Sequence, residues 1–344
     1  MDIDILCRDG SPLGVSMRTL WGEDQIGVGG SEYGLLTLCE EWYKAGHRVR
    51  LYNNPRDPRG GSPFGQFPIG SFVPSDRRDV LINFRSPSEQ AIVSNGLKIW
   101  LSCDQYTIGD YAKFAPAMDK IVCISPFHQT YFRGTYDIEN TIVIDLPVRV
   151  HDLDGISVEK RPNSLIFTSV PDRGLHFLRQ AWDRLKREIP DLSLTITSDY
   201  RLWGLHEPRN ERFRQDWIAL EDVSFVGAVK RQTLLEIQLA ADLFVFPNIY
   251  DELFCVSLAE AQVCGAYPIT SEVGALRTTS LGTLIRGNPM DGRSGFLKRF
   301  QNEIIEILKD RNALEVKRES MRKRAIERFH PDNIMKQWEE RVFK

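Results

Sequence analysis

The sequence predicts an α/β protein of two successive domains, in each of which helices cover a parallel β-sheet. Short apolar runs alternate with segments of helical periodicity along most of the chain. These runs are apolar on both faces, which is typical of the buried strands of a parallel sheet. The length of 344 residues suits two domains of ordinary size.

The first domain is expected over residues 1–150. Its strands are predicted at residues 3–7, 48–52, 80–84, 99–102 and 121–125. A helix is predicted over 31–45, with Ser31 as its N-cap and Gly46 as its stop, because apolar residues recur there at helical spacing. The segment 53–74 is polar and rich in proline, glycine and arginine, and it predicts a loop.

A charged, proline-containing stretch over residues 151–163 interrupts the pattern, and an interdomain linker is expected there. The alternation then begins again and predicts a second domain over 164–328. Its strands are expected at residues 165–169, 194–197, 223–226, 243–246 and 267–270. Its helices are expected at residues 175–188, 232–241 and 257–264, followed by a helical tail over 297–328. A break at His330-Pro331 separates the last helix, within 329–344.

Composition narrows the class of function. Lysine and arginine number 44 against 47 acids, a formal charge of -3, so the chain lacks the basic surplus of a nucleic-acid coat and no stable nucleic-acid complex is expected. The six cysteines are widely spaced without a CxxC pair, which indicates reduced thiols in a cytoplasmic protein. The acidic N-terminus does not resemble a signal peptide, and no apolar run is long enough to span a bilayer. Peripheral membrane contact stays open.

Two glutamates, Glu252 and Glu260, follow the predicted strand 243–246, with seven residues between them. Glu252 is expected in the loop at the carboxyl edge of the sheet, where open α/β sheets bind ligands, and Glu260 one turn inside the next helix. That helix is expected to open with the amides of Phe254, Cys255 and Val256. Unpaired amides at a helix N-terminus suit a diphosphate, and loop carboxylates suit sugar hydroxyls. The pattern therefore indicates a sugar-nucleotide site.

This region resembles family 4 of the retaining glycosyltransferases, which have the GT-B fold. The match is the E-x7-E motif with its flanks, Ala-Asp-Leu-Phe-Val-Phe-Pro at 241–247 and Glu-Ala-Gln-Val-Cys-Gly-Ala-Tyr-Pro at 260–268. The resemblance implies two Rossmann-like domains facing a cleft, with the donor in the C-terminal domain and the acceptor in the N-terminal one. It also implies a last helix that returns to the first domain. It assigns the donor sugar's hydroxyls to Glu252 and the ribose to Glu260, while Cys255 replaces the family's glycine.

A second element, Arg173-Gly174, follows the predicted strand 165–169. The resembling family grips the donor diphosphate with two cations in this region, and Arg173 corresponds to the second of them. A guanidinium fits phosphate bidentately. Ser169 stands near the place of the first cation, so the resemblance implies a donor site that combines Arg173 with hydroxyl groups and amides.

A third element, Gly27-Val-Gly29-Gly30-Ser31-Glu32, precedes the first predicted helix. It is not a dinucleotide fingerprint, because Glu32 stands where the last glycine would be. The resembling family has a Gly-Gly-x-Glu element that faces the cleft and touches donor phosphate or acceptor. Gly29 and Gly30 are therefore predicted to contact the donor, and Ser31 to lie on the acceptor side.

The family's N-domain histidine has no counterpart in the run after Ile99. Three residues are candidates for the place of this histidine. Asp104 is predicted to be catalytic, and Arg85 and Gln105 are predicted to lie on the acceptor side. His128 begins a predicted helix and is a further acceptor-side candidate, although a structural role at the helix N-terminus accounts for it more simply. A retaining transfer depends mainly on electrostatic stabilisation of the leaving diphosphate, so it does not require that base.

The resemblance implies a retaining glycosyltransferase that moves a hexose-type sugar from a UDP- or GDP-type donor to a glycan, lipid or small-molecule acceptor. Neither metal nor cofactor is expected, because no Asp-x-Asp or histidine cluster accompanies the phosphate site. Three alternatives stay open at this stage. They are a non-catalytic sugar-nucleotide or glycan-binding protein of the same shape, a sugar-nucleotide epimerase or hydrolase, and, least favoured, an NAD-dependent oxidoreductase.

Overall fold

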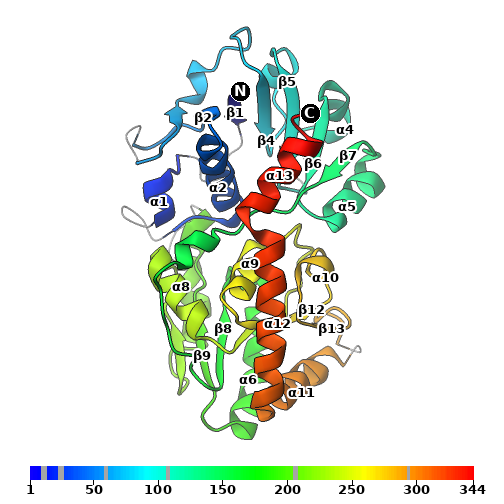
Figure 1. Ribbon diagram of the computed structural model, residues 1–344. Coiled ribbons are helices and arrows are strands. Elements are labelled where there is room, and N and C mark those ends of the chain that lie inside the picture. Colours follow the sequence, from blue (N-terminus) through cyan, green and yellow to red (C-terminus); the bar gives the residue numbers. More distant parts are fainter. Residues whose placement is uncertain (9–13, 22–26, 58–60, 106–108, 204–207, 293–294) are drawn as a thin grey trace. The chain divides into compact units, whose positions relative to one another are not determined.

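The computed structural model describes residues 1–8, 14–21, 27–57, 61–105, 109–203, 208–292 and 295–344 (Figure 1). The chain divides into two compact units. Unit 1 is Met1–Pro147 together with Phe329–Lys344, and unit 2 is Val148–Arg328. Each unit is an α/β domain built on its own sheet. Within the described residues, no helix has the length and apolar character that crossing a membrane requires.

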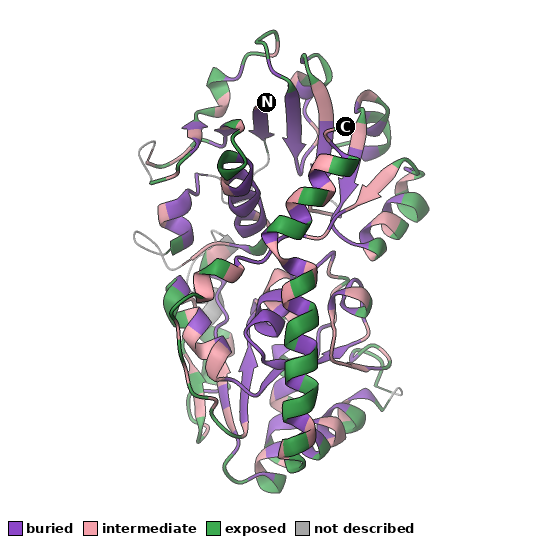
Figure 2. Cartoon of the chain, in the orientation of Figure 1, coloured by how far each residue is buried: buried purple, intermediate pink, exposed green. Residues whose placement is uncertain are grey.

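The sheet of unit 1 has seven strands in the order β3-β2-β1-β4-β5-β6-β7, and all its neighbouring strands are parallel. The strands are β1 (Asp2–Cys7), β2 (Arg48–Tyr52), β3 (Gly65–Phe67), β4 (Val80–Phe84), β5 (Leu97–Ser102), β6 (Lys120–Cys123) and β7 (Thr141–Val143). The helices of this unit are α1 (Met17–Trp21), α2 (Gly30–Lys44), α3 (Glu89–Ile92), α4 (Tyr111–Phe114), α5 (Pro126–Tyr136) and α13 (Pro331–Arg341). The central strands are buried on both faces, as their apolar sequences predict (Figure 2).

Two predictions for unit 1 were wrong in detail. The segment 53–74 is not all loop, because β3 forms within it and pairs with β2. The buried side chain of Gln66 holds β3 in place by donating to the carbonyl oxygen of Val15 at 2.8 Å. Ser31 is not the N-cap of α2, because the helix already begins at Gly30 and Gly29 takes the extended conformation of the cap.

The C-terminal helix α13 packs within unit 1. The ring of Trp338 meets that of Trp42 on α2 edge-on, with centroids 5.1 Å apart. His47 Nε2 lies 3.0 Å from Glu339 Oε1, and Arg341 donates to the carbonyl oxygen of Val143 on β7 at 2.8 Å. Aromatic packing and polar contacts together attach the end of the chain to α2 and β7.

The sheet of unit 2 has six parallel strands in the order β10-β9-β8-β11-β12-β13. They are β8 (Ser164–Phe167), β9 (Ser193–Ile196), β10 (Val223–Phe225), β11 (Leu243–Phe246), β12 (Tyr267–Ser271) and β13 (Thr283–Ile285). The helices are α6 (Leu175–Glu188), α7 (Pro208–Gln215), α8 (Arg231–Ala240), α9 (Val256–Val263), α10 (Leu276–Thr279), α11 (Phe296–Lys309) and α12 (Arg311–Phe329). The single helical tail predicted over 297–328 is thus two helices. They break at Asp310, whose Oδ1 accepts from the amide of Ala313 at 2.9 Å.

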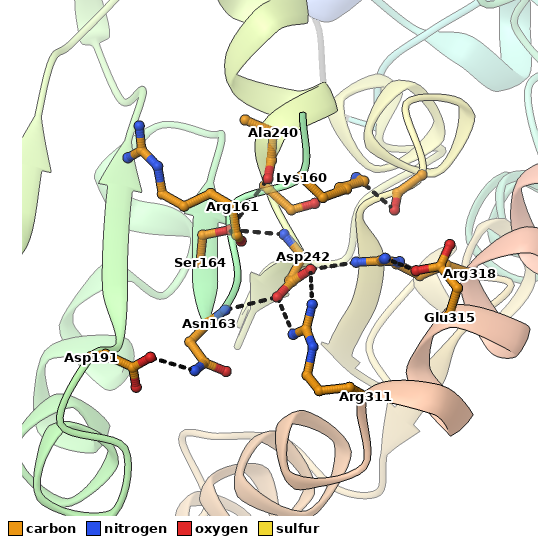
Figure 3. Close-up of polar contacts among 12 residues, drawn as sticks. Lys160, Arg161, Asn163, Ser164, Asp191, Ala240, Asp242, Arg311, Glu315 and Arg318 are labelled. Carbon is orange, nitrogen blue, oxygen red and sulfur yellow. Dashed lines mark hydrogen bonds and ion pairs between the residues drawn. The ribbon is translucent and has the colours of Figure 1, made fainter. Parts of the chain in front are cut away.

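A buried carboxylate attaches α12 to the sheet. Asp242, fully buried just before β11, accepts from the amide of Asn163 at 2.8 Å and from Arg311 at 3.1 Å, and it also pairs with Arg318 (Figure 3). The two arginines stand seven positions apart and so share one face of α12. Lys160 lies next to this cluster and donates to the carbonyl oxygen of Ala241 at 2.7 Å, while burial lowers its pKa to about 8.

Candidate active site

The strand order of unit 2 places a ligand site between β8 and β11. Numbered along the chain from β8, the order is 3-2-1-4-5-6, in which the chain leaves β8 toward one side of the sheet and β11 toward the other. The two strands pair directly, with Leu165 opposite Leu243. Loops diverge at such a switch point and leave a crevice beyond the carboxyl ends of the strands. The residues that follow β8 and β11 are therefore the candidate ligand-binding residues of unit 2.

Arg173 and Glu252 meet at this point. Arg173 ends a short 3-10 helix (Pro171–Arg173) after β8, and Glu252 lies in the loop after β11. Nε of Arg173 is 3.2 Å from Oε1 of Glu252, and the two side chains are 14% and 19% exposed. The guanidinium also lies over the ring of Tyr250, 3.3 Å from its centroid. Burial raises the pKa of the Glu252 carboxyl above its ordinary value, and the charge of Arg173 opposes that rise.

Glycines bring the loops of this site into backbone contact. Gly174, at a φ of +102°, packs so closely on the strand end of β11 that a Cβ would lie 2.7 Å from the carbonyl carbon of Pro247. The amide of Ala275 donates to the carbonyl oxygen of Glu252 at 2.7 Å, and a Cβ on Gly274 would lie 2.7 Å from the Glu252 nitrogen. The loop after β12 therefore fixes the backbone of Glu252, and with it the position from which the carboxylate side chain extends.

Sequence reasoning missed two residues of this loop, Asn248 and Tyr250. Buried Asn248 donates from Nδ2 to the carbonyl oxygen of Tyr250 at 2.6 Å and accepts the amide of the same residue at 3.1 Å. Ser271 donates to the carbonyl oxygen of Asn248 at 2.5 Å. These contacts shape the turn that sets the Tyr250 ring under Arg173. The available signal was the Asn-Ile-Tyr run at 248–250, which follows the apolar strand β11 after Pro247.

Helix α9 begins beside this loop. Phe254 is buried, and Cys255 takes the N-cap position with a left-handed φ of +73°, a conformation that favours glycine. Val256 opens the helix, whose first amides have no partner within the helix. Burial raises the pKa of the Cys255 thiol to about 12, so it stays protonated near neutral pH. Cys255 thus keeps a backbone conformation that favours glycine, the residue that the resembling family has at this position.

We expect Cys255→Gly to keep the free energy of unfolding within about 1 kcal/mol of wild type. Relief of the left-handed strain offsets the lost burial of the thiol and the added freedom of the unfolded chain. Cys255→Val should cost about 2 kcal/mol or more, because a β-branched residue fits this region worst. Urea denaturation of both variants measures the difference. Equal stability of the two would contradict the strain assigned to this position.

The other predicted donor residues lie around the same edge of unit 2. Ser169 follows β8 and is partly buried, and its carbonyl oxygen accepts from the hydroxyl of Ser198. Glu260, on α9, is buried, and its Oε1 lies 2.6 Å from Nη2 of Arg231 on α8. Within the described residues, no group of three or more His, Cys, Asp and Glu side chains is arranged to hold a metal ion.

Unit 1 has its own switch point, between β1 and β4. Along the chain, helix α2 comes after β1 and α1, and it carries Ser31 and Glu32 in its first turn. Gly29 is its N-cap and Gly30 its first residue. Arg85 directly follows β4. Nη2 of Arg85 lies 3.0 Å from Oε1 of Glu32, and both residues are buried. Arg85 has a left-handed φ of +61°, and its carbonyl oxygen accepts from Trp100 Nε1 at 2.7 Å. A buried ion pair therefore joins the two loops of this switch.

The remaining candidates of unit 1 follow β5 and β6. Asp104 accepts the amide of Gln105 at 2.6 Å, and the carbonyl oxygen of buried Gln105 accepts from the hydroxyl of Tyr136. His128 is fully buried, and its Nδ1 accepts the amide of Ile124 at 3.2 Å. Burial lowers the pKa of His128 to about 3, so it stays neutral. The contacts of His128 are those of a structural residue at a helix N-terminus.

Comparison with known proteins now defines the class. Residues 162–309 match the protein family described as Glycosyl transferases group 1. A glycosyltransferase from Rickettsia africae ESF-5 superposes with a TM-score of 0.75 at 15% identity, covering 100% of this chain and 98% of that one. Sucrose-phosphate synthase from Thermosynechococcus elongatus gives 0.67 at 17% identity, with 100% and 99% covered. The Anabaena protein HepE, in complex with UDP and glucose, gives 0.68 at 16% identity, with 99% and 98% covered.

At these identities the solved structures show the fold alone, and no curated protein sequence matches the chain. The protein has the GT-B fold, with two Rossmann-like α/β units. With the group 1 match over most of unit 2, it is a glycosyltransferase.

Proposed function

We propose that this enzyme is a retaining glycosyltransferase whose unit 2 binds a nucleoside diphosphate hexose. The observation that carries the proposal is the contact of Arg173 with Glu252, 3.2 Å apart at the switch point and next to the start of α9. A cation, a carboxylate and a helix N-terminus are the groups that a diphosphate linked to a sugar needs. The match to group 1 glycosyltransferases over residues 162–309 supports this use of unit 2.

Each group has a distinct role in the proposal. Arg173 and the first amides of α9 neutralise the diphosphate, so no metal is needed for its charge. Glu252 accepts hydrogen bonds from hydroxyls of the sugar, and Glu260 accepts those of the ribose. Ser169 adds a hydroxyl donor beside the phosphates. The only other small molecule required is the nucleotide sugar itself, as co-substrate.

The proposed reaction replaces one bond at the anomeric carbon by another. The bond from this carbon to the diphosphate oxygen breaks, and an acceptor oxygen attacks on the same face, so the configuration is retained. The acceptor's proton passes to the departing diphosphate. Asp104 is the catalytic candidate of unit 1, while Gly29 and Gly30 would reach the donor and Ser31, Arg85 and Gln105 the acceptor.

The donor is proposed to carry uracil or guanine. Support for uracil comes from HepE, which was solved with UDP and glucose and shares the fold over nearly the whole chain. The acceptor is proposed to be a glycan, a lipid or a small molecule, which peripheral contact with a membrane would also suit.

We expect one nucleoside diphosphate to stabilise the protein in a thermal-shift titration with UDP, GDP, ADP, TDP and NAD. At about 100 times the dissociation constant a ligand adds about 2.7 kcal/mol of stability. The stabilisation should persist in EDTA, since Arg173 and α9 supply the positive potential. A response to NAD alone, or to none of the five, would refute the donor site, and a response that requires magnesium would refute metal independence.

A further inference from the structure

Four charged side chains form a buried chain that ends at Glu260. Nε of Arg149 lies 3.1 and 3.0 Å from the two carboxylate oxygens of Asp152. Asp152 in turn lies 2.8 Å from Nε of Arg231, and Nη2 of Arg231 lies 2.6 Å from Oε1 of Glu260. All four side chains are at most 7% exposed. Arg149 and Asp152 lie at the start of unit 2, Arg231 opens α8, and Glu260 lies on α9.

Positive and negative side chains alternate along this row of four residues, so their formal charges sum to zero. Buried charges persist when each is paired, and removal of one partner leaves an uncompensated charge. Arg231 is the only member with a carboxylate on both sides, Asp152 and Glu260, so its guanidinium is held at two edges. Its contact with Glu260 joins Nη2 to a single carboxylate oxygen, Oε1, at 2.6 Å. The protein thus orients this carboxylate through one of its two oxygens.

We propose that Arg231 is a positioning residue that orients Glu260 for the ribose hydroxyls of the donor nucleotide. The inference rests on the proposed function, in which Glu260 binds the ribose. A carboxylate accepts from both hydroxyls of a 2′,3′-diol at lower entropic cost when its plane is fixed, and a guanidinium clamped by Asp152 fixes it in advance of binding. Selectivity for the ribose therefore depends on a side chain of α8 that need not touch the ligand.

The test compares a nucleoside diphosphate with its 2′,3′-dideoxy form. The nucleotide is the one that stabilises the wild type most, and calorimetry gives both dissociation constants for wild type, Arg231→Met and Arg231→Lys. We expect the wild type to prefer the ribose form by 10-fold or more. Arg231→Met should reduce the preference below 3-fold while affinity for the dideoxy form stays within 2-fold. Arg231→Lys, which keeps the charge but cannot bridge both carboxylates, should fall between them.

A matched control is Arg184→Met in α6. Arg184 is also partly buried, and it donates to Gln301 Oε1 at 3.0 Å, away from Glu260. This variant should lose stability without any change in ribose preference. If Arg231→Met does not fold, Asp152→Asn is measured in its place, because it releases one edge of the guanidinium and should also lower the preference.

Four results separate the positioning role of Arg231 from the proposed function. An Arg231→Met variant that keeps the full ribose preference, or that loses affinity for both forms equally, overturns the positioning role. An unchanged preference in Asp152→Asn does the same if that variant is the one measured. If the wild-type protein binds both forms equally, Glu260 does not bind the ribose, and the positioning role of Arg231 is overturned as well. A wild-type protein that binds no nucleotide contradicts the proposed function itself.

Discussion

Gly174→Ala is expected to destroy the proposed donor site and to lower the free energy of unfolding by about 4 kcal/mol or more, a loss typical of severe core or backbone conflicts. The new Cβ would lie 2.7 Å from the carbonyl carbon of Pro247 and closer still to its oxygen. Both are backbone atoms of the strand end that precedes Glu252, so relief requires the loops after β8 and β11 to separate. The φ of +102° adds strain of its own. Urea denaturation and nucleotide titration measure the two effects.

Gly155→Ala is the matched control for this prediction. Gly155 also has a positive φ, +78°, but a Cβ there would meet nothing within 4 Å. Its substitution should cost only the strain of the backbone, about 1–2 kcal/mol, and leave nucleotide affinity unchanged. If the two variants lose equal stability, the close approach of Gly174 to Pro247 has no energetic weight and the two loops are not held together there.

The fold was predictable because long apolar strands alternate with amphipathic helices. Both sheets follow that alternation, and the GT-B expectation is confirmed. The strands that escaped prediction, β3, β7 and β13, have only three residues each, which leaves little pattern to detect, although β10 has the same length and was predicted. They are added at sheet edges, where pairing with an already formed neighbour decides the conformation.

The proximity of Arg173 and Glu252 follows from topology. Both residues stand directly after strands of one parallel sheet, so a sequence that reveals the strands also places their loops at one edge. The partners of Glu260 could not be found in this way. Arg231 lies at the start of a helix and Asp152 in a short 3-10 turn, far apart in sequence, and a single arginine or aspartate carries no periodic signal.

Tyr250 differs from both cases, because the sequence shows an aromatic residue near Glu252 but gives no reason to assign it to the site. It stands within the motif that predicted the site, yet nothing in the residue order says that its ring lies under Arg173. That geometry depends on the amide of Asn248, which closes the turn on Tyr250 from both sides. The place of Glu252 at the sheet edge can thus be predicted from a motif, whereas the packing of Tyr250 against Arg173 requires the three-dimensional loop.

Glu252→Gln is expected to lower the rate of sugar transfer by about 100-fold or more, since its acceptor strength is what the transition state uses. Glutamine keeps the shape but replaces an ionised oxygen by an amide next to Arg173. The rate is measured as release of the nucleoside diphosphate from its sugar nucleotide. Glu188→Gln, an exposed change at the end of α6, is the control and should leave the rate unchanged. A full rate in Glu252→Gln would remove Glu252 from the proposed sugar contact.

The same substitution should make the protein more stable at neutral pH. The folded-state pKa of Glu252 is raised above the ordinary 4.5 by burial, so the folded protein binds this proton more tightly than the unfolded chain does. Stability is therefore lost as the pH rises from 4.5 through the folded-state pKa. The thermal midpoint of Glu252→Gln should exceed that of the wild type at pH 7, and the difference should close as the pH falls toward 4.5. A variant less stable at pH 7 would mean that the ion pair with Arg173 outweighs burial. The expected pair of results, a slower and more stable enzyme, would identify Glu252 as a residue retained for function against the preference of the fold.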